Sequence, residues 1–259
     1  RARPSDVVFL PNATPRQILG VALLLLRNPV YRTLRYVLIL RYSVHRPSGP
    51  LADRKTNLDK ETADLYAMAL EKLAGVDSTG AVQLATDSAE LAKEYGAYTK
   101  RPIAVLPIPH TSQPAPADFP LEIPPKDASR RVVYLGDARE EKGFELLPAL
   151  VRACTAGPAL PATEFVFQAF ISSHYHGRMA GAIEELERLR LPNVHLIKRS
   201  LSSSAYQTLL NSADLVLLPY DAATYQARTS GPFVEAICAD KPVVVPRNSW
   251  MSRQLNQSE

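Results

Sequence analysis

The segment Arg228-Thr-Ser-Gly-Pro-Phe-Val-Glu-Ala236 joins a cation, a helix start and a carboxylate within nine residues. Thr229 and Ser230 can cap the helix, Gly231 lets another molecule approach the backbone, and Pro232 suits a first helical turn. The unpaired N–H groups and the dipole of such a helix start attract an anion, and Arg228 adds a positive charge beside them. Glu235, one turn further in, offers a carboxylate to vicinal hydroxyls. This combination suits a nucleotide, with phosphate at the helix start and ribose at Glu235. An ordinary capped helix with a solvated glutamate is the alternative.

A second candidate site follows the strand-like run that ends at Leu135. Gly136 comes directly after this run, where a ligand can approach the backbone. Arg139 and Lys142 stand near the start of the next helix, and two cations there could neutralise a diphosphate without a metal. The alternative is a surface loop whose cations pair with the two glutamates between them.

Other familiar site patterns are absent from the sequence. It contains no Walker motif, no complete Gly-x-Gly-x-x-Gly and no defensible Ser/His/Asp arrangement. His174 and His176 have no cysteine or carboxylate at ligand spacing, so we interpret them as polar loop residues. His110 is interpreted in the same way, and no metal site is predicted.

Strand-like and helix-like segments alternate along most of the chain, which predicts doubly wound parallel α/β sheets. Strands are expected at 6–11, 82–86, 103–108, 131–135, 164–171, 194–197, 215–219 and 242–245. Helices are expected at 15–27, 58–74, 88–98, 143–156, 179–191, 203–212 and 232–239. The stretch 47–57 carries serine, glycine, proline and charges, and is expected to be a mobile loop.

A run of prolines interrupts this alternation, at positions 114, 116, 120, 124 and 125. Proline at this density forms a semi-rigid extended linker. We therefore expect a Rossmann-like domain over 1–110, a linker over 111–130 and a second Rossmann-like domain over 131–259, facing each other across a cleft. The first residue is Arg1, so we expect a piece of a longer chain whose first domain is incomplete.

The charge of the chain is uneven. Residues 1–50 hold eight arginines and one acid, which gives them a net charge of +7. The whole chain has a net charge of +4, so the remaining residues together carry −3. The uncharged run Gln17–Leu26 is ten residues long, half of the ~20 that a membrane span needs. A buried helix is the favoured interpretation, and a basic apolar element resting on an anionic membrane is the alternative. These arginines alternate with aliphatic residues rather than with polar or aromatic ones, so no nucleic-acid partner is expected.

The two cysteines, Cys154 and Cys238, lie inside apolar helical stretches. We expect two buried free thiols rather than a disulfide, which indicates a reducing compartment. The predicted location is the cytoplasm, with peripheral contact at the inner face of the membrane through the arginine-rich region as the alternative.

Residues 130–255 resemble the donor-binding half of a GT-B glycosyltransferase of the large retaining group 1 family. That half opens with a strand, Gly-Arg and, a few residues later, Lys-Gly, which Gly136 and Lys142-Gly143 match. It closes with Gly-x-x-x-Glu-Ala and then Lys/Arg-Pro-Val-Val, which Gly231, Glu235-Ala236 and Lys241-Pro-Val-Val244 match. Residues 82–110 are similar to the last part of the family's acceptor domain.

Two positions depart from the family pattern. Asp137 stands where the family has arginine, with Arg139 two residues later. The family's glutamate pair is eight positions apart, and Ala227 stands eight before Glu235. The resemblance implies that Glu235 contacts the donor ribose, and the absent first glutamate is the one associated with the donor sugar.

The resemblance implies transfer of a sugar from a nucleotide-diphosphate sugar to a glycan, lipid-linked or small-molecule acceptor, with retention, without a metal and without a cofactor. Arg139 and Lys142 would then act in catalysis on the departing diphosphate. Gly136, Arg228, Ser230, Gly231 and Glu235 would bind the donor. A non-catalytic nucleotide-sugar-binding or scaffold protein of the same fold is the main alternative, and a same-fold epimerase or phosphorylase is another.

Overall fold

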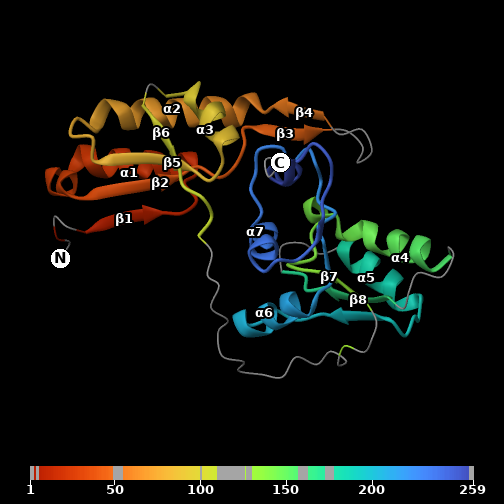
Figure 1. Ribbon diagram of the computed structural model, residues 1–259. Coiled ribbons are helices and arrows are strands. Elements are labelled where there is room, and N and C mark those ends of the chain that lie inside the picture. Colours follow the sequence, from red (N-terminus) through yellow and green to blue (C-terminus); the bar gives the residue numbers. More distant parts are fainter. Residues whose placement is uncertain are drawn as a thin grey trace. The chain divides into compact units, whose positions relative to one another are not determined.

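The computed structural model describes residues 3, 6–48, 55–99, 101–109, 126, 130–156, 163–172 and 178–256. These residues form two compact units (Figure 1). Unit 1 holds Arg1–Ile108 together with the short segment Gln226–Thr229, and unit 2 holds Pro109–Tyr225 and Ser230–Glu259. Most of the expected linker, as well as His110, His174 and His176, lies outside the described residues.

Unit 1 contains a four-stranded parallel sheet of order β1-β2-β5-β6. Its strands are β1 (Val7–Leu10), β2 (Arg35–Ile39), β5 (Val82–Thr86) and β6 (Ile103–Val105). Its helices are α1 (Pro15–Arg27), α2 (Lys60–Val76) and α3 (Ala89–Gly96), with a 3-10 turn η1 (Pro29–Thr33). The consecutive strands are neighbours, so each βαβ crossover moves the chain one strand along the sheet.

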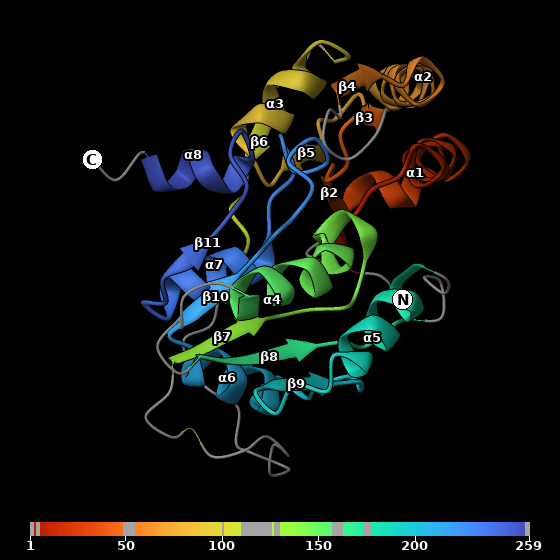
Figure 2. The same ribbon diagram turned by 90° about the vertical axis from the view of Figure 1, so that its right-hand side faces the viewer.

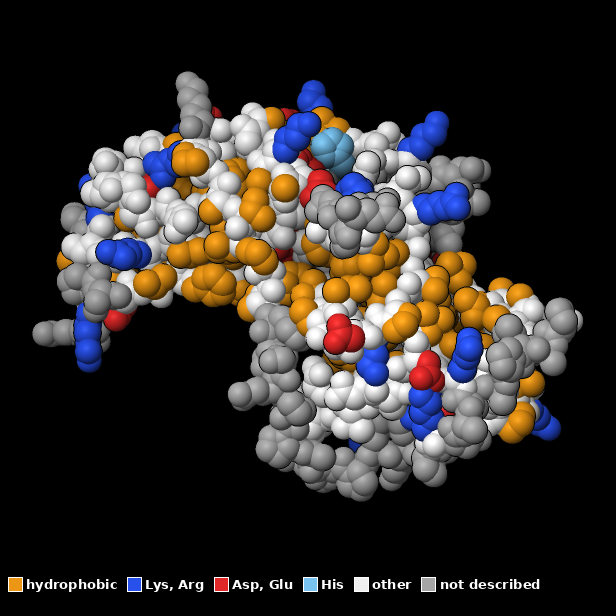
Figure 3. All heavy atoms as spheres, viewed as in Figure 1, with side chains coloured by type: hydrophobic (Ala, Val, Ile, Leu, Met, Phe, Trp, Pro, Cys, Tyr) orange, Lys and Arg blue, Asp and Glu red, His pale blue; other side chains and the backbone are white. Residues whose placement is uncertain are grey.

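The described helices of unit 1 share one hydrophobic core with alternate residues of the sheet, among them Tyr36, Leu38 and Leu84. The outward residues of the edge strand β1, Val7 and Phe9, are 54% and 57% exposed. Figure 3 shows hydrophobic side chains gathered along the strands of this unit. One face of the sheet is therefore packed, and β1 presents apolar side chains on the other.

The uncharged run forms the helix α1, which buries one face as expected and leaves Leu23, Leu24 and Leu26 exposed on the other. Thr14 and Gln17 form a capping box at its start, which fixes the boundary. Its buried residues recur at helical spacing: Ile18, Val21, Ala22 and Leu25. Within the described ranges, none of the helices is both long and apolar enough to cross a membrane.

The prediction of a loop over 47–57 was wrong at both ends, where the structure has short strands. His45–Ser48 (β3) and Lys55–Leu58 (β4) pair as an antiparallel ribbon, with Ser48 opposite Lys55. The error arose because these strands are short and polar, and most of their side chains are exposed. Such strands lack the alternation of apolar and polar residues on which sequence prediction depends.

Unit 2 contains a five-stranded parallel sheet of order β11-β10-β7-β8-β9. Its strands are β7 (Arg130–Tyr134), β8 (Thr163–Gln168), β9 (Val194–Ile197), β10 (Leu215–Leu217) and β11 (Val243–Val244). Its helices are α4 (Leu147–Ala156), α5 (Arg178–Arg188), α6 (Ser203–Ser212), α7 (Gly231–Cys238) and α8 (Trp250–Asn256), with 3-10 turns η3 (Glu140–Lys142) and η4 (Phe144–Leu146).

Helices cover both faces of this sheet, as Figure 2 shows for α4 and α6. On β7, Tyr134 packs in the core that holds α4 and α5, whereas its neighbour Val133 packs in the core that holds α6 and α7. The chain runs from β7 outward to β9, then returns to place β10 on the other side of β7. Unit 2 is therefore the doubly wound parallel sheet that the sequence predicted, and its strand order reverses between β7 and β10.

The two cysteines are free, as expected, but only one of them is shielded. Cys154 on α4 is half-buried, whereas Cys238 at the end of α7 is exposed. The inward residues of α7 include Phe233 and Ala236. Cys238, two positions beyond Ala236, falls on the outward side, so the expectation of two buried thiols was wrong for Cys238.

Candidate functional site

The candidate site of unit 2 lies where the strand order reverses, at the carboxyl ends of β7 and β10. Open α/β sheets bind their ligands at this position, because the loops diverge there and leave a crevice. The loops after the two strands are in direct contact. Asp221 N–H donates to the carbonyl oxygen of Glu141 at 3.0 Å. A Cβ atom on Gly143, whose φ is +67°, would lie 1.9 Å from the carbonyl oxygen of Pro219.

Gly143→Ala is therefore expected to destabilise unit 2. The added methyl group would collide with the backbone, and a positive φ is unfavourable for alanine. Together the two effects should lower the free energy of unfolding by about 2–4 kcal/mol. Gly231→Ala is the matched control, because nothing lies within 4 Å of the added atom. Thermal unfolding of the two variants measures the difference, and equal melting temperatures would contradict the packing described for Gly143.

The structure brings Lys142 and Gly136 together. Gly136 lies two residues after the end of β7 and has a φ of +102°. A Cβ atom on Gly136 would lie 2.5 Å from Lys142 Nζ. The N–H of Gly136 donates to Gln168 Oε1 at 2.8 Å, which ties the turn to the end of β8. Because a side chain at position 136 would displace the lysine, glycine is needed for the ammonium group to lie against this turn. A positive charge is thus held at the carboxyl end of the central strand.

Arg139 lies on the same loop, and its charge is engaged locally. One of its terminal nitrogens lies 2.7 Å from Asp137 Oδ2, and the other lies 3.7 Å from Glu141 Oε1. The sequence alternative was a loop whose cations pair with nearby glutamates, and for Arg139 the partners are one glutamate and the unexpected aspartate. Two carboxylates beside one guanidinium lower the attraction that it can exert on a further anion.

The start of α7 has the form that the sequence predicted. Ser230 is the N-cap, and its hydroxyl accepts a hydrogen bond from the N–H of Phe233 at 3.3 Å. Gly231 has open space on the side where a Cβ would project. An anion or a ligand backbone can therefore approach this helix start, which follows the carboxyl end of β10.

Glu235 has a partner that the sequence did not reveal. The Tyr206 hydroxyl, from α6, donates to Glu235 Oε2 at 2.5 Å. Burial, followed by the nearby charge of Glu235, raises the pKa of the Tyr206 phenol above its ordinary value, so the phenol stays protonated and remains a donor. One oxygen of the carboxylate is thereby oriented. Residue spacing gave no signal for this pair, because 29 positions separate its members.

Arg228 belongs to unit 1, with the rest of the segment Gln226–Thr229. Its guanidinium lies over the ring of Tyr42, 5.5 Å from the ring centre. Ala227, at the position of the family's first glutamate, packs against the hydrophobic core of unit 1, and its carbonyl oxygen accepts from the Ser88 hydroxyl at 2.7 Å. The chain thus uses this position for packing. A role for Arg228 at the donor diphosphate stays a prediction.

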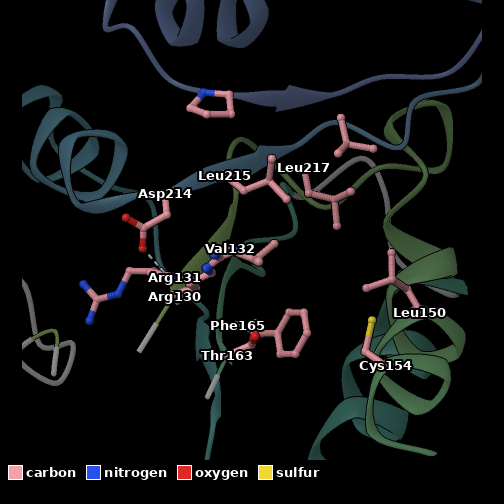
Figure 4. A pocket seen from close by; sticks show the side chains of 12 residues that line it. Arg130, Arg131, Val132, Leu150, Cys154, Thr163, Phe165, Asp214, Leu215 and Leu217 are labelled. Atoms are coloured by element: carbon pink, nitrogen blue, oxygen red, sulfur yellow. Dashed lines mark hydrogen bonds between the residues drawn. The ribbon is translucent and has the colours of Figure 1, made fainter. Parts of the chain in front are cut away.

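Unit 2 also has a cavity of about 610 Å³, and Figure 4 shows the side chains that line it. It includes the amino-terminal residues of β7 and β8, such as Arg130 and Thr163, and reaches α4 at Leu150 and Cys154. Arg131 N–H donates to Asp214 Oδ2 at its polar end, at 2.8 Å. This cavity lies on a face of the sheet and includes the strand ends opposite to the switch point, so we do not assign it to the donor.

Among the residues that the structure describes, no three histidine, cysteine, aspartate or glutamate side chains gather in a way that could hold a metal ion.

The comparisons with known proteins establish the fold. No protein-family model matches the sequence, and no curated protein matches it. Solved structures do match: an α,α-trehalose-phosphate synthase (UDP-forming) from Burkholderia xenovorans in complex with glucose-6-phosphate has a TM-score of 0.63 at 13% identity. An Escherichia coli trehalose-6-phosphate structure bound with UDP-2-fluoro glucose has a TM-score of 0.62 at 14% identity. The chain has the GT-B fold.

The matches cover 98% of this chain but only 62% and 61% of those two structures. The chain therefore spans about three fifths of the length of these structures. The N-terminal domain of Candida albicans trehalose-6-phosphate phosphatase also matches, with a TM-score of 0.59, 12% identity, and coverage of 99% of this chain and 63% of that one. The GT-B fold thus occurs in proteins named for different activities, so the activity must be argued from the site.

Proposed function

We propose that the protein is a glycosyltransferase that moves a sugar from a nucleotide-diphosphate sugar to an acceptor, with retention. The observation that carries this proposal is the Lys142 ammonium group against Gly136, at the switch point of a doubly wound sheet. The fold shared with trehalose-phosphate synthases supports it, since one of those structures was solved with UDP-2-fluoro glucose.

In this proposal the groups of unit 2 divide the nucleotide between them. Lys142 stabilises the charge that grows on the departing diphosphate, with a smaller contribution from Arg139. The N–H groups of Ser230 and Gly231 donate to phosphate oxygens at the start of α7. Glu235, oriented by Tyr206, accepts hydrogen bonds from the ribose hydroxyls.

A second candidate function is a nucleotide-sugar-binding protein without transferase activity. The observation that favours it is Ala227, which packs against the hydrophobic core of unit 1 at the position where the resembled family has the glutamate associated with the donor sugar. Product formation by the full-length protein, supplied with candidate donors and acceptors, separates the two functions. Binding of nucleotide sugars without turnover in any pairing would support the second.

Nucleoside diphosphate binding is expected to survive metal removal. Lys142 and the start of α7 supply positive potential, and no metal cluster occurs among the described residues. Calorimetric titration with UDP, GDP and ADP, in EDTA and in Mg²⁺, should give the same affinity for the nucleotide that binds. An affinity that disappears in EDTA would contradict the metal-free diphosphate site.

We also propose a cytoplasmic location with peripheral membrane contact through the arginine-rich region. The helix α1 supports the contact, because Leu23 and Leu26 are 50% and 57% exposed and Arg27 ends the helix. Such a surface suits the boundary of an anionic bilayer.

A further inference from the structure

The cavity of about 610 Å³ in unit 2 has an apolar wall to which three adjacent strands contribute. Val132 on β7, Phe165 on β8 and Leu217 on β10 belong to the face of the sheet on which α4 and α5 pack. Leu150 and Cys154, four positions apart on one side of α4, also line the cavity (Figure 4). The wall is therefore continuous with the hydrophobic core beneath these two helices.

The same face of the sheet is open over the outer strands β10 and β11. Leu215 is half-buried and Val244 is 46% exposed, whereas Val216, on the opposite face of β10, is fully buried. The helix α8 does not cover the open face, because its buried residue Met251 packs in the core that holds α6 and α7. Parallel sheets usually have both faces covered, and an open apolar surface marks a binding site. These side chains are therefore suited to contact with a further molecule.

The polar groups of the cavity gather at the amino-terminal ends of the strands. Arg130 begins β7 and stands two residues before Val132, so both belong to the cavity face of the sheet. Asp214 directly precedes β10, and its Oδ2 accepts from the N–H of Arg131 at 2.8 Å. The cavity is thus polar at one end and apolar along its wall.

Arg130 gives the polar end its positive charge. The charges beside it are matched, because Lys126 Nζ lies 2.6 Å from Asp214 Oδ1 and Arg131 Nε lies 2.6 Å from Glu164 Oε2. Within the part of the chain that the structure describes, Arg130 has no ion pair with a carboxylate. A ligand that brings one negative charge to this end would therefore form an ion pair with Arg130.

The volume and the lining of the cavity together define the ligand that fits. About 610 Å³ is within the roughly 300–1,000 Å³ of pockets that bury a whole small molecule. Apolar side chains from strands and helix suit a hydrocarbon body. A singly charged carboxylate matches the one unpaired cation, whereas a phosphate dianion would bring a second charge close to the apolar wall at a desolvation cost.

We propose that unit 2 binds an apolar carboxylate of the fatty-acid type in this cavity. Its carboxylate lies at Arg130, and its hydrocarbon chain lies along Leu215, Leu217 and Val244. The candidate donor site is at the opposite ends of the strands, so the carboxylate and a nucleotide bind at the same time. The proposal therefore does not depend on the glycosyltransferase function.

The test is a calorimetric titration of the full chain with octanoate, octan-1-ol and acetate, at concentrations below those at which octanoate forms micelles. We expect saturable binding of octanoate, weaker binding of octan-1-ol and none of acetate. Arg130→Gln should weaken octanoate roughly two- to fivefold, since solvent screens the charge of an exposed arginine, and leave octan-1-ol unchanged. Arg188→Gln is the matched control, because Arg188 is exposed on α5 and does not line the cavity. Equal losses in the two arginine variants would overturn the assignment of the carboxylate to Arg130.

Val244→Glu tests the apolar part of the site. A carboxylate placed beside the hydrocarbon chain should lower octanoate affinity by more than roughly tenfold. The fold should persist, because Val244 is 46% exposed on an edge strand. Ile237→Glu is the matched control, since Ile237 is 41% exposed on α7 and does not line the cavity. Equal losses in these two variants, or no saturable binding of octanoate by the parent, would overturn the site.

The two cysteines report where octanoate binds. Cys154 lines the cavity, whereas Cys238 is exposed and does not line it. Octanoate should slow the alkylation of Cys154 by iodoacetamide in proportion to the fraction of protein that has bound it, and leave Cys238 unchanged. Mass spectrometry of the two cysteine peptides measures both rates. Unchanged alkylation of Cys154 at saturating octanoate, or competition between octanoate and a nucleoside diphosphate, would contradict the proposed position.

A second copy of the chain could cover the same apolar surface. Sedimentation equilibrium of the parent without octanoate distinguishes this occupant. A monomer that binds octanoate supports the small-molecule site. A dimer that Val244→Glu dissociates, together with no binding of octanoate, overturns the proposal.

Discussion

Replacement of Lys142 with methionine is expected to lower sugar transfer by about 10²–10³-fold, the loss typical when a group that stabilises transition-state charge is removed. Methionine keeps most of the length of the side chain and removes the charge. Since the diphosphate gains charge as it departs, the loss should be larger in turnover than in nucleoside diphosphate affinity. Affinity should fall roughly ten- to hundredfold, because a hydrogen bond to a charged group contributes about 1.5–3 kcal/mol.

Lys198→Met is the matched control for this prediction. Lys198 is a lysine of unit 2 that follows β9 and pairs with Glu187 on α5, away from the switch point of the sheet. The Lys198→Met variant loses the same positive charge as Lys142→Met. Any effect of the changed net charge alone should therefore be the same in both variants. Equal nucleotide affinity and equal turnover in Lys142→Met and the parent would remove Lys142 from the site.

Arg139→Ala should lower nucleoside diphosphate affinity less than Lys142→Met does. Asp137 and Glu141 already engage Arg139, so its net attraction for a diphosphate is reduced. A larger loss in Arg139→Ala than in Lys142→Met would reverse the roles that the loop geometry supports. Nucleoside diphosphate titrations of the two variants make the comparison.

Sequence reasoning located elements best where local chemistry fixed both ends. The helix α1 has the predicted bounds because Thr14 caps it and Asn28 follows it. The helix α6 also has its predicted bounds, since Ser202 caps it. The strands β5 and β9 were placed correctly from their apolar runs. In these cases a few neighbouring residues decide the structure, so a single sequence carries the information.

The features that sequence reasoning missed depend on distant partners. Strand β2 lay inside an arginine-flanked apolar run that was not assigned to a strand, and only pairing with β1 and β5 identifies it. Arg131 is 2% exposed because Glu164, 33 residues away, accepts from its Nε at 2.6 Å. Spacing cannot reveal either partner.

In the candidate site too, the sequence predicted the local features and missed the contacts between distant residues. The cap and the open backbone at Gly231 are local features, and the sequence predicted a cap at Thr229 or Ser230, of which the structure shows Ser230. The sequence placed Lys142 near the start of the next helix, and the structure shows that its ammonium group lies against Gly136. The contacts of Arg228 with Tyr42 and of Tyr206 with Glu235 join separate elements, so only the folded chain reveals them.

Glu235→Gln is expected to weaken nucleoside diphosphate binding roughly ten- to hundredfold, because a charged acceptor for the ribose hydroxyls is lost. The fold should persist, because the glutamine carbonyl can still accept from the Tyr206 hydroxyl that joins α6 to α7. The melting temperature of this variant should therefore stay close to that of the parent. Nucleoside binding without phosphate should fall as well, whereas Lys142→Met should spare it.

Tyr206→Phe separates a ribose-binding Glu235 from one that only joins two helices. In the parent, the phenol orients one carboxylate oxygen at 2.5 Å and stays protonated because burial and the nearby carboxylate raise its pKa. If Glu235 binds ribose, Tyr206→Phe should weaken nucleotide binding less than Glu235→Gln does, since the charged acceptor remains and only its orientation is loosened. If the segment is an ordinary capped helix, both variants should bind nucleoside diphosphates as the parent does, and any effect should be confined to the melting temperature. Calorimetric titration and thermal unfolding of the two variants together therefore decide between a ribose acceptor and a structural hydrogen bond.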